Sequence, residues 1–198
     1  MIRKLLALVL LAAPAVADPI TESGYVIGCS DKMCKIAAAG FTLTAGRKST
    51  DPEVFRFMQE LEPLTAVSFE GEIGTLGDAT APVKVTYIET MPEDPYQDTL
   101  RYIQGNWVPM GDTSGYYIRI KGMEWQDIID GQVSSSFLMQ PSDTCTSGVQ
   151  PGGIALNLVP IGGDPSWAIC WKIDYATDTE MDISDFTGEQ GQVSLLRK

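Results

Sequence analysis

Residues 100–197 form a series of short segments in which apolar and polar residues alternate, separated by turn residues rich in Gly and Asp. Successive side chains of a β-strand point to opposite faces, so this alternation predicts half-buried strands. Trp167, Ile169, Trp171 and Ile173, for example, are expected to share one face. The expected strands are Leu100–Val108, Gly115–Lys121, Met123–Ile129, Gln132–Gln140, Gly153–Val159, Trp167–Tyr175, Thr179–Ser184 and Gln192–Arg197. Eight sequential strands of this kind predict an up-and-down meander, and closing the meander into a small barrel removes exposed strand edges.

The first half of the chain predicts strands around one helix. Asp51 is a favourable N-cap residue and Pro52 suits the first helical position. The expected buried face of the helix consists of Val54, Phe57, Met58 and Leu61. The expected strands are Gly24–Gly28, Cys34–Ala45, Ala66–Ile73 and Val83–Glu89. Taken as three strands, a helix and two strands, this order resembles the OB fold, a small five-stranded barrel.

The polar segment Met91–Asp98 carries two prolines and separates the two patterned regions, which is typical of a domain edge. We place the boundary near residue 95. The predicted fold class is therefore mainly β: an OB-like domain with one helix over residues 18–95, followed by a small eight-stranded up-and-down barrel over residues 96–198.

The stretch YIQGNWVPMGD, which begins at Tyr102, opens the predicted barrel and contains Gly105 two residues before Trp107. A Gly-x-Trp in the first strand of an eight-strand meander resembles the calycins, the lipocalin-like and avidin-like barrels. The resemblance implies that Trp107 plugs one end of the barrel and that Arg197, near the end of the last strand, packs over its ring. The layout is also similar to small exported bacterial proteins with a lipocalin-like C-terminal domain, in which two later cysteines bridge the barrel.

The expected interior of this barrel is crowded. Trp167, Trp171 and Phe137 are among the side chains expected to point inward, and side chains of that size can fill an eight-stranded interior completely. A roomy lipid pocket is therefore not expected.

The N-terminus has the three parts of a secretory signal peptide. Arg3 and Lys4 are basic, Leu5–Ala13 is apolar, and Ala15-Val16-Ala17 is a small-residue cleavage site. Cleavage after Ala17 would leave a mature chain that begins at Asp18. The short bacterial-type signal predicts a periplasmic or secreted protein, and no later stretch is long and apolar enough for stable insertion in a membrane.

The expected mature chain is strongly acidic. Removing Arg3 and Lys4 from the 14 basic residues leaves 12 against 26 acidic ones, a net charge of −14. Nucleic acid binding needs clustered Lys and Arg, so a nucleic-acid partner is not expected, although OB surfaces often serve that purpose. The charge is compatible with a cationic partner, or simply with solubility.

Four cysteines in an exported chain predict two disulfides, for which three pairings exist. We favour Cys29–Cys34 and Cys145–Cys170, because each bridge then lies within one half of the chain. The four residues between Cys29 and Cys34 differ from the two of a thioredoxin-like motif.

The sequence has no histidine, so the usual Ser-His and Cys-His pairs cannot form. We expect no catalytic residues, cofactor or metal ion, and favour a non-catalytic binding or interaction protein of the cell envelope whose protein or small-molecule partner is unknown. A small-ligand calycin is one alternative, and a carboxylate hydrolase a more distant one. Another is similarity to periplasmic lysozyme inhibitors, which insert a Ser-Gly loop into a cationic enzyme; Asp112, Ser114 and Tyr117 would form that interaction loop.

Overall fold

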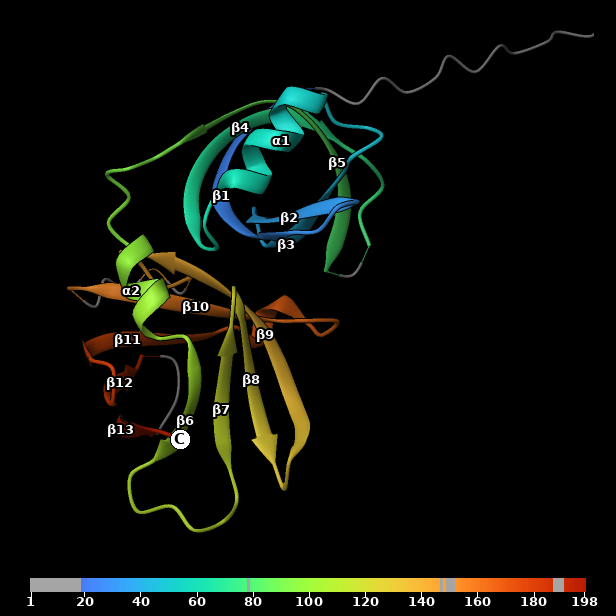
Figure 1. The fold of residues 1–198 in the computed structure, drawn as a ribbon. Coiled ribbons are helices and arrows are strands. Elements are labelled where there is room, and N and C mark those ends of the chain that lie inside the picture. The colour runs from blue at the N-terminus through green and yellow to red at the C-terminus, as the bar shows by residue number, and fades with distance from the viewer. Residues whose placement is uncertain (1–18, 78, 147, 149–151, 187–190) are drawn as a thin grey trace, which may run out of the picture.

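The computed structural model describes residues 19–77, 79–146, 148, 152–186 and 191–198, so the expected signal peptide and its cleavage site lie outside the described residues. Strands dominate, and they form two closed barrels that follow one another along the chain (Figure 1). The mainly β fold class, with five strands in the first barrel and eight in the second, is confirmed.

The first barrel has the strand order β1-β2-β3-β5-β4, and β4 pairs with β1 to close it. All neighbours are antiparallel except β3 and β5. One helix, α1, connects β3 to β4, as expected of an OB-like order. The elements are β1 (Ile20–Cys29), β2 (Met33–Ala38), β3 (Phe41–Gly46), α1 (Pro52–Glu60), β4 (Thr65–Ile73) and β5 (Thr80–Thr90). The segment expected to be extended at Cys34–Ala45 contains the two strands β2 and β3, because Ala39 and Gly40 form a turn with positive φ.

Helix α1 begins as the sequence predicts. The Asp51 carboxylate accepts hydrogen bonds from the backbone N–H groups of Glu53 and Val54, at 2.8 and 3.4 Å. Its buried face differs from the expected one: Phe55 is buried together with Met58, and Phe57 is exposed. The apolar face of this nine-residue helix is wide, so helical spacing alone did not show which of Phe55 and Phe57 would be buried.

The second barrel is a meander in which each strand pairs with the next, and β13 pairs with β6 to close it. Every pairing is antiparallel. The elements are α2 (Gln97–Tyr102), β6 (Gly105–Pro109), β7 (Tyr117–Lys121), β8 (Glu124–Ile129), β9 (Gln132–Ser142), β10 (Ile154–Pro160), the 3₁₀ turn η1 (Pro165–Trp167), β11 (Ile169–Ala176), β12 (Glu180–Asp185) and β13 (Gln192–Arg197).

Two expectations for this barrel were wrong. The strand expected from Leu100 begins only at Gly105, because the Asp94 carboxylate accepts hydrogen bonds from the N–H groups of Tyr96 and Gln97 and so starts helix α2. Trp167 does not face the interior. It lies in η1 with its side chain 72 % exposed, because the turn that begins at Asp164 continues through it.

The two barrels contact each other directly. One cluster of buried side chains includes Tyr25 and Ala37 from the first barrel together with Met123 and Met139 from the second. The segment in which the domain boundary was expected runs between β5 and α2, on one side of this contact (Figure 1). Asp94 in that segment accepts a hydrogen bond from the Tyr25 hydroxyl at 3.1 Å, so the connection is anchored to the first barrel.

Candidate functional site

Trp107 on β6 is fully buried in the second barrel. Its indole Nε1–H donates to the carbonyl oxygen of Ile103 at 2.7 Å. The guanidinium of Arg197 lies over the ring, 4.5 Å from its centroid, and donates to the carbonyl oxygens of Gln104 and Tyr102 at 2.5 and 2.8 Å. Arg197 is exposed, so its guanidinium lies over the ring at the surface of the barrel and not in the interior.

The backbone conformation at residue 105 and the nearby Arg197 explain why a glycine occupies this position. Its φ is +128°, and a Cβ at this position would lie 2.8 Å from Nη1 of Arg197. A residue with a side chain would therefore be strained and would collide with the guanidinium. The Gly-x-Trp spacing reflects the packing of Trp107 and Arg197.

Beyond Trp107, the interior of the barrel contains a cavity of about 290 Å³. Four aromatic side chains line it: Tyr116, Trp125, Phe137 and Trp171. The other lining residues are Pro109, Ile118, Asp127, Leu158, Ile169, Ile183 and Val193. The interior is therefore not filled, in contrast to the expectation from the sequence. One reason is that Trp167, one of the bulky side chains expected to fill it, lies outside.

Asp127 is the one charged side chain among these lining residues, and three side chains donate to its carboxylate. The Tyr116 hydroxyl and the Trp125 Nε1–H donate to Oδ1, at 2.9 and 3.2 Å, and the Ser135 hydroxyl donates to Oδ2 at 2.5 Å. An ionised carboxylate has about four acceptor positions, so Oδ2 retains one that no described side chain uses. All three donors are neutral, so they orient the carboxylate without cancelling its charge.

No cation of the chain compensates this carboxylate in the part that the structure describes. The ion pairs found there are Lys84–Glu72, Arg101–Glu62 and Lys172–Asp174. Burial raises the pKa of the Tyr116 hydroxyl, and the neighbouring Asp127 charge raises it further. Tyr116 therefore stays protonated at neutral pH and remains a hydrogen-bond donor to Asp127.

Strand register brings this network together. Asp127 on β8 pairs with Ile118 on β7 and with Ser135 on β9, while Tyr116 immediately precedes β7. Trp125 and Asp127 are two residues apart and share the inner face of β8. A register shift follows Asp127, after which Ile128 is buried and Ile129 is exposed. Sequence reasoning missed this site, because alternation in MEWQDII does not show which face of the strand Asp127 occupies.

The residues expected to form an interaction loop are not part of the cavity. The Asp112 carboxylate accepts hydrogen bonds from the N–H and the hydroxyl of Ser114, at 3.0 and 2.9 Å, which lowers the pKa of Asp112. Tyr117 begins β7, and its ring lies against the Lys198 ammonium, 4.1 Å from Nζ. Only the neighbouring Tyr116 reaches the barrel interior.

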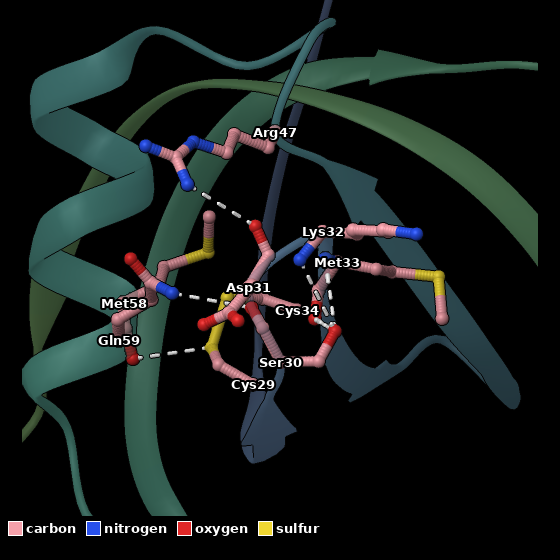
Figure 2. Close-up of a disulfide and its surroundings, with 9 residues drawn as sticks. All are labelled: Cys29, Ser30, Asp31, Lys32, Met33, Cys34, Arg47, Met58 and Gln59. Atoms are coloured by element: carbon pink, nitrogen blue, oxygen red, sulfur yellow. Dashed lines mark hydrogen bonds between the residues drawn. A yellow bond between two sulfur atoms is a disulfide. The ribbon is translucent and has the colours of Figure 1, made fainter.

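Both disulfides have the favoured pairing, Cys29–Cys34 and Cys145–Cys170. The first joins opposite residues of the β1–β2 hairpin, whose turn lies against the end of α1 (Figure 2). There the Gln59 side-chain amide donates to the carbonyl oxygen of Ser30 at 3.1 Å, and Arg47 donates to that of Asp31 at 3.4 Å. This bridge joins the two strands of the hairpin, and the Gln59 hydrogen bond holds the hairpin turn to the helix.

The second disulfide ties the segment before β10 to β11, which carries Trp171. Cys145 and Cys170 are buried, and the Asn157 amide beside them donates to the carbonyl oxygen of Thr144 at 3.0 Å. Trp171 follows Cys170 directly, so this bridge supports a strand that lines the cavity.

Two other hollows offer less specific chemistry. One of about 310 Å³ lies between the barrels, and no charged side chain lines it. The other, of about 620 Å³, is a shallow surface depression beside α2 to which Asp98, Arg101, Asp178 and Arg197 contribute. Its arginines are already engaged, Arg197 with Trp107 and Arg101 with Glu62 at 3.5 Å. The barrel cavity is therefore the better candidate site, because it combines apolar walls with one oriented charge.

Comparison with models of known protein families and with curated protein sequences finds no match for this chain. Within the described residues, no three Cys, Asp or Glu side chains are grouped so that they could hold a metal ion. None of the described helices has the length and apolar character needed to cross a membrane.

Proposed function

We propose that this protein is an exported, non-catalytic binding protein whose eight-stranded barrel holds a small ligand. The observation that carries the proposal is the cavity of about 290 Å³ that contains the Asp127 network. Ligand sites in proteins are mostly apolar, with a few fixed polar groups, and begin near 300 Å³. The small-ligand alternative is thereby favoured over an interaction protein that binds through its outer surface alone.

A calycin-like ancestry of the barrel is part of the proposal. It is supported by the eight-strand meander, by Trp107 at the closed end and by the Arg197 guanidinium 4.5 Å from its ring centroid. In such a barrel the plugged end supplies rigidity and the opposite end gives access. Pro109 and Tyr116, which line the cavity, adjoin the loop between β6 and β7.

The proposed location is the periplasm or the extracellular medium. Two disulfides support an oxidising compartment. The signal-like segment 1–17 supports export and predicts a mature N-terminus at Asp18. Mass measurement of the exported protein tests this directly.

The ligand-binding proposal is tested by filling the cavity. Val193 lines it, and Val193→Phe would add a ring to its space. The matched control is Val133→Phe, because Val133 is on the same barrel but exposed. Ligand-observed NMR with a mixture of small water-soluble compounds measures binding to both variants. We expect binding to the wild type and the control and loss of binding in Val193→Phe; equal binding by all three proteins would contradict the proposal.

A further inference from the structure

We propose that the barrel cavity binds a small organic cation, with its ammonium group at the Asp127 carboxylate and its apolar part among the aromatic rings. This inference rests on the proposed ligand-binding function and specifies the class of ligand.

The carboxylate gives the first argument. Asp127 is partly buried, lines the cavity and has no ion-pair partner among the described residues. A charge in such surroundings is costly unless an opposite charge is near. Three neutral donors hold the carboxylate in one orientation and leave a free acceptor position on Oδ2. A ligand N–H donor, or the positive charge of an ammonium, complements that position.

The cavity walls give the second argument. Tyr116, Trp125, Phe137 and Trp171 line the same cavity as this carboxylate, and the first two contact it. Aromatic faces attract cations through their quadrupole, and several rings around one site are the usual means of recognising alkylammonium groups. The rings also offer apolar surface against which the uncharged part of the ligand packs, so the cavity recognises both charge and shape.

The size of the cavity limits the ligand. A volume of about 290 Å³ equals that of about ten water molecules, at ~30 Å³ each. This admits a compound of up to about ten non-hydrogen atoms and excludes a lipid or a folded peptide. The net charge of −12 for the whole sequence favours the approach of a cation over that of an anion.

The test uses two cations and their uncharged counterparts of matching shape. The cations are choline and benzylamine, and the counterparts are 3,3-dimethylbutan-1-ol and benzyl alcohol. Binding to the mature wild-type protein is measured by calorimetry and by the fluorescence of its tryptophans. We expect at least one cation to bind about tenfold or more tightly than its counterpart, because a cation–carboxylate contact away from water is stronger than the contact of the carboxylate with a neutral group. This comparison requires no variant.

Variants then locate the charge. Asp127→Asn keeps the size of the side chain and removes its charge, and Asp130→Asn makes the same change at an exposed turn residue that does not line the cavity. We expect Asp127→Asn to lose about tenfold in affinity for the cation while its affinity for the uncharged counterpart changes less than about twofold. Asp130→Asn should change neither affinity by more than about twofold.

The outcomes separate this inference from the proposed function. If the uncharged compounds bind as tightly as the cations and Val193→Phe abolishes their binding, the cation inference is wrong and the ligand-binding function stands. If Asp127→Asn and Asp130→Asn weaken cation binding equally, the overall charge attracts the cation and the assignment to Asp127 is overturned. If none of the four compounds binds, the inference is overturned, and the wider NMR mixture then decides the proposed function separately.

Discussion

Trp107 is predicted to be the most costly single side chain to remove from the second barrel. It is fully buried, and its indole N–H donates to the Ile103 carbonyl oxygen at 2.7 Å. Replacement of a buried aromatic residue by alanine costs about 3–5 kcal/mol, and the unpaired buried carbonyl adds about 1 kcal/mol. We therefore expect Trp107→Ala to lower the free energy of unfolding by about 4–6 kcal/mol. Trp107→Phe retains part of the packing and should cost about 2 kcal/mol.

The matched control is Trp167→Ala, which removes the same side chain from a position where it is 72 % exposed. A substitution at such a position usually changes stability by less than about 0.5 kcal/mol. Urea unfolding followed by far-UV circular dichroism measures all three variants without relying on tryptophan fluorescence. If Trp107→Ala and Trp167→Ala lowered the free energy of unfolding equally, the role assigned to Trp107 in closing the barrel would be refuted.

Three further predictions concern the glycine, a disulfide and the tyrosines. Gly105→Ala should lower the free energy of unfolding by about 1–2 kcal/mol, because a φ of +128° strains any residue with a Cβ and the Arg197 guanidinium would have to shift. Thermal unfolding measures this change, and unchanged stability would contradict the strain. Removing the Cys145–Cys170 bridge by a double Cys→Ala change should lower the free energy of unfolding by about 3.5 kcal/mol, the loop-closure value for a sequence separation of 25. Urea unfolding measures this against the protein with both bridges intact. A change near zero would show that the bridge does not constrain the unfolded chain. Burial raises the pKa of both Tyr25 and Tyr116, so an unfolded chain releases their protons near pH 10 while the folded chain keeps them. Their stabilising contribution is complete below about pH 10, and above it the free energy of unfolding should fall by up to ~1.4 kcal/mol per pH unit for each tyrosine. Tyr25→Phe should flatten this decline in urea titrations at pH 9–11.5, and an unchanged slope would contradict the raised pKa.

The fold was largely predictable because strand alternation depends on local residue order. The turn residues and the apolar faces of β10 to β13 fixed the meander, and Trp107 with Arg197 indicated where it closes. Helix α2 was missed because six residues show too little periodicity and because its start depends on the Asp94 side chain, which lies outside the helix. The register shift after Asp127 could not be predicted either, because a β-bulge changes the side of the sheet to which a side chain points and leaves no clear mark in the sequence.

The candidate site was harder to predict than the fold. Tyr116, Asp127 and Ser135 come from three positions along the chain, and only the pairing of β7, β8 and β9 brings them together. An acidic residue within an apolar strand is usually assigned to the solvent-facing side. One reason that the interior is hollow is the exclusion of Trp167 from β11, which follows from the turn at Asp164 and which strand alternation did not show.

Native mass spectrometry of the protein purified from the cells that produce it tests most directly whether the barrel interior holds a ligand. We expect a complex in which a small organic molecule accompanies the wild-type protein and the Val133→Phe control but is absent from Val193→Phe. Wild-type protein that carries no small molecule, and that gives the same spectrum as Val193→Phe even after incubation with the NMR compound mixture, would contradict the claim that the barrel interior is a binding site.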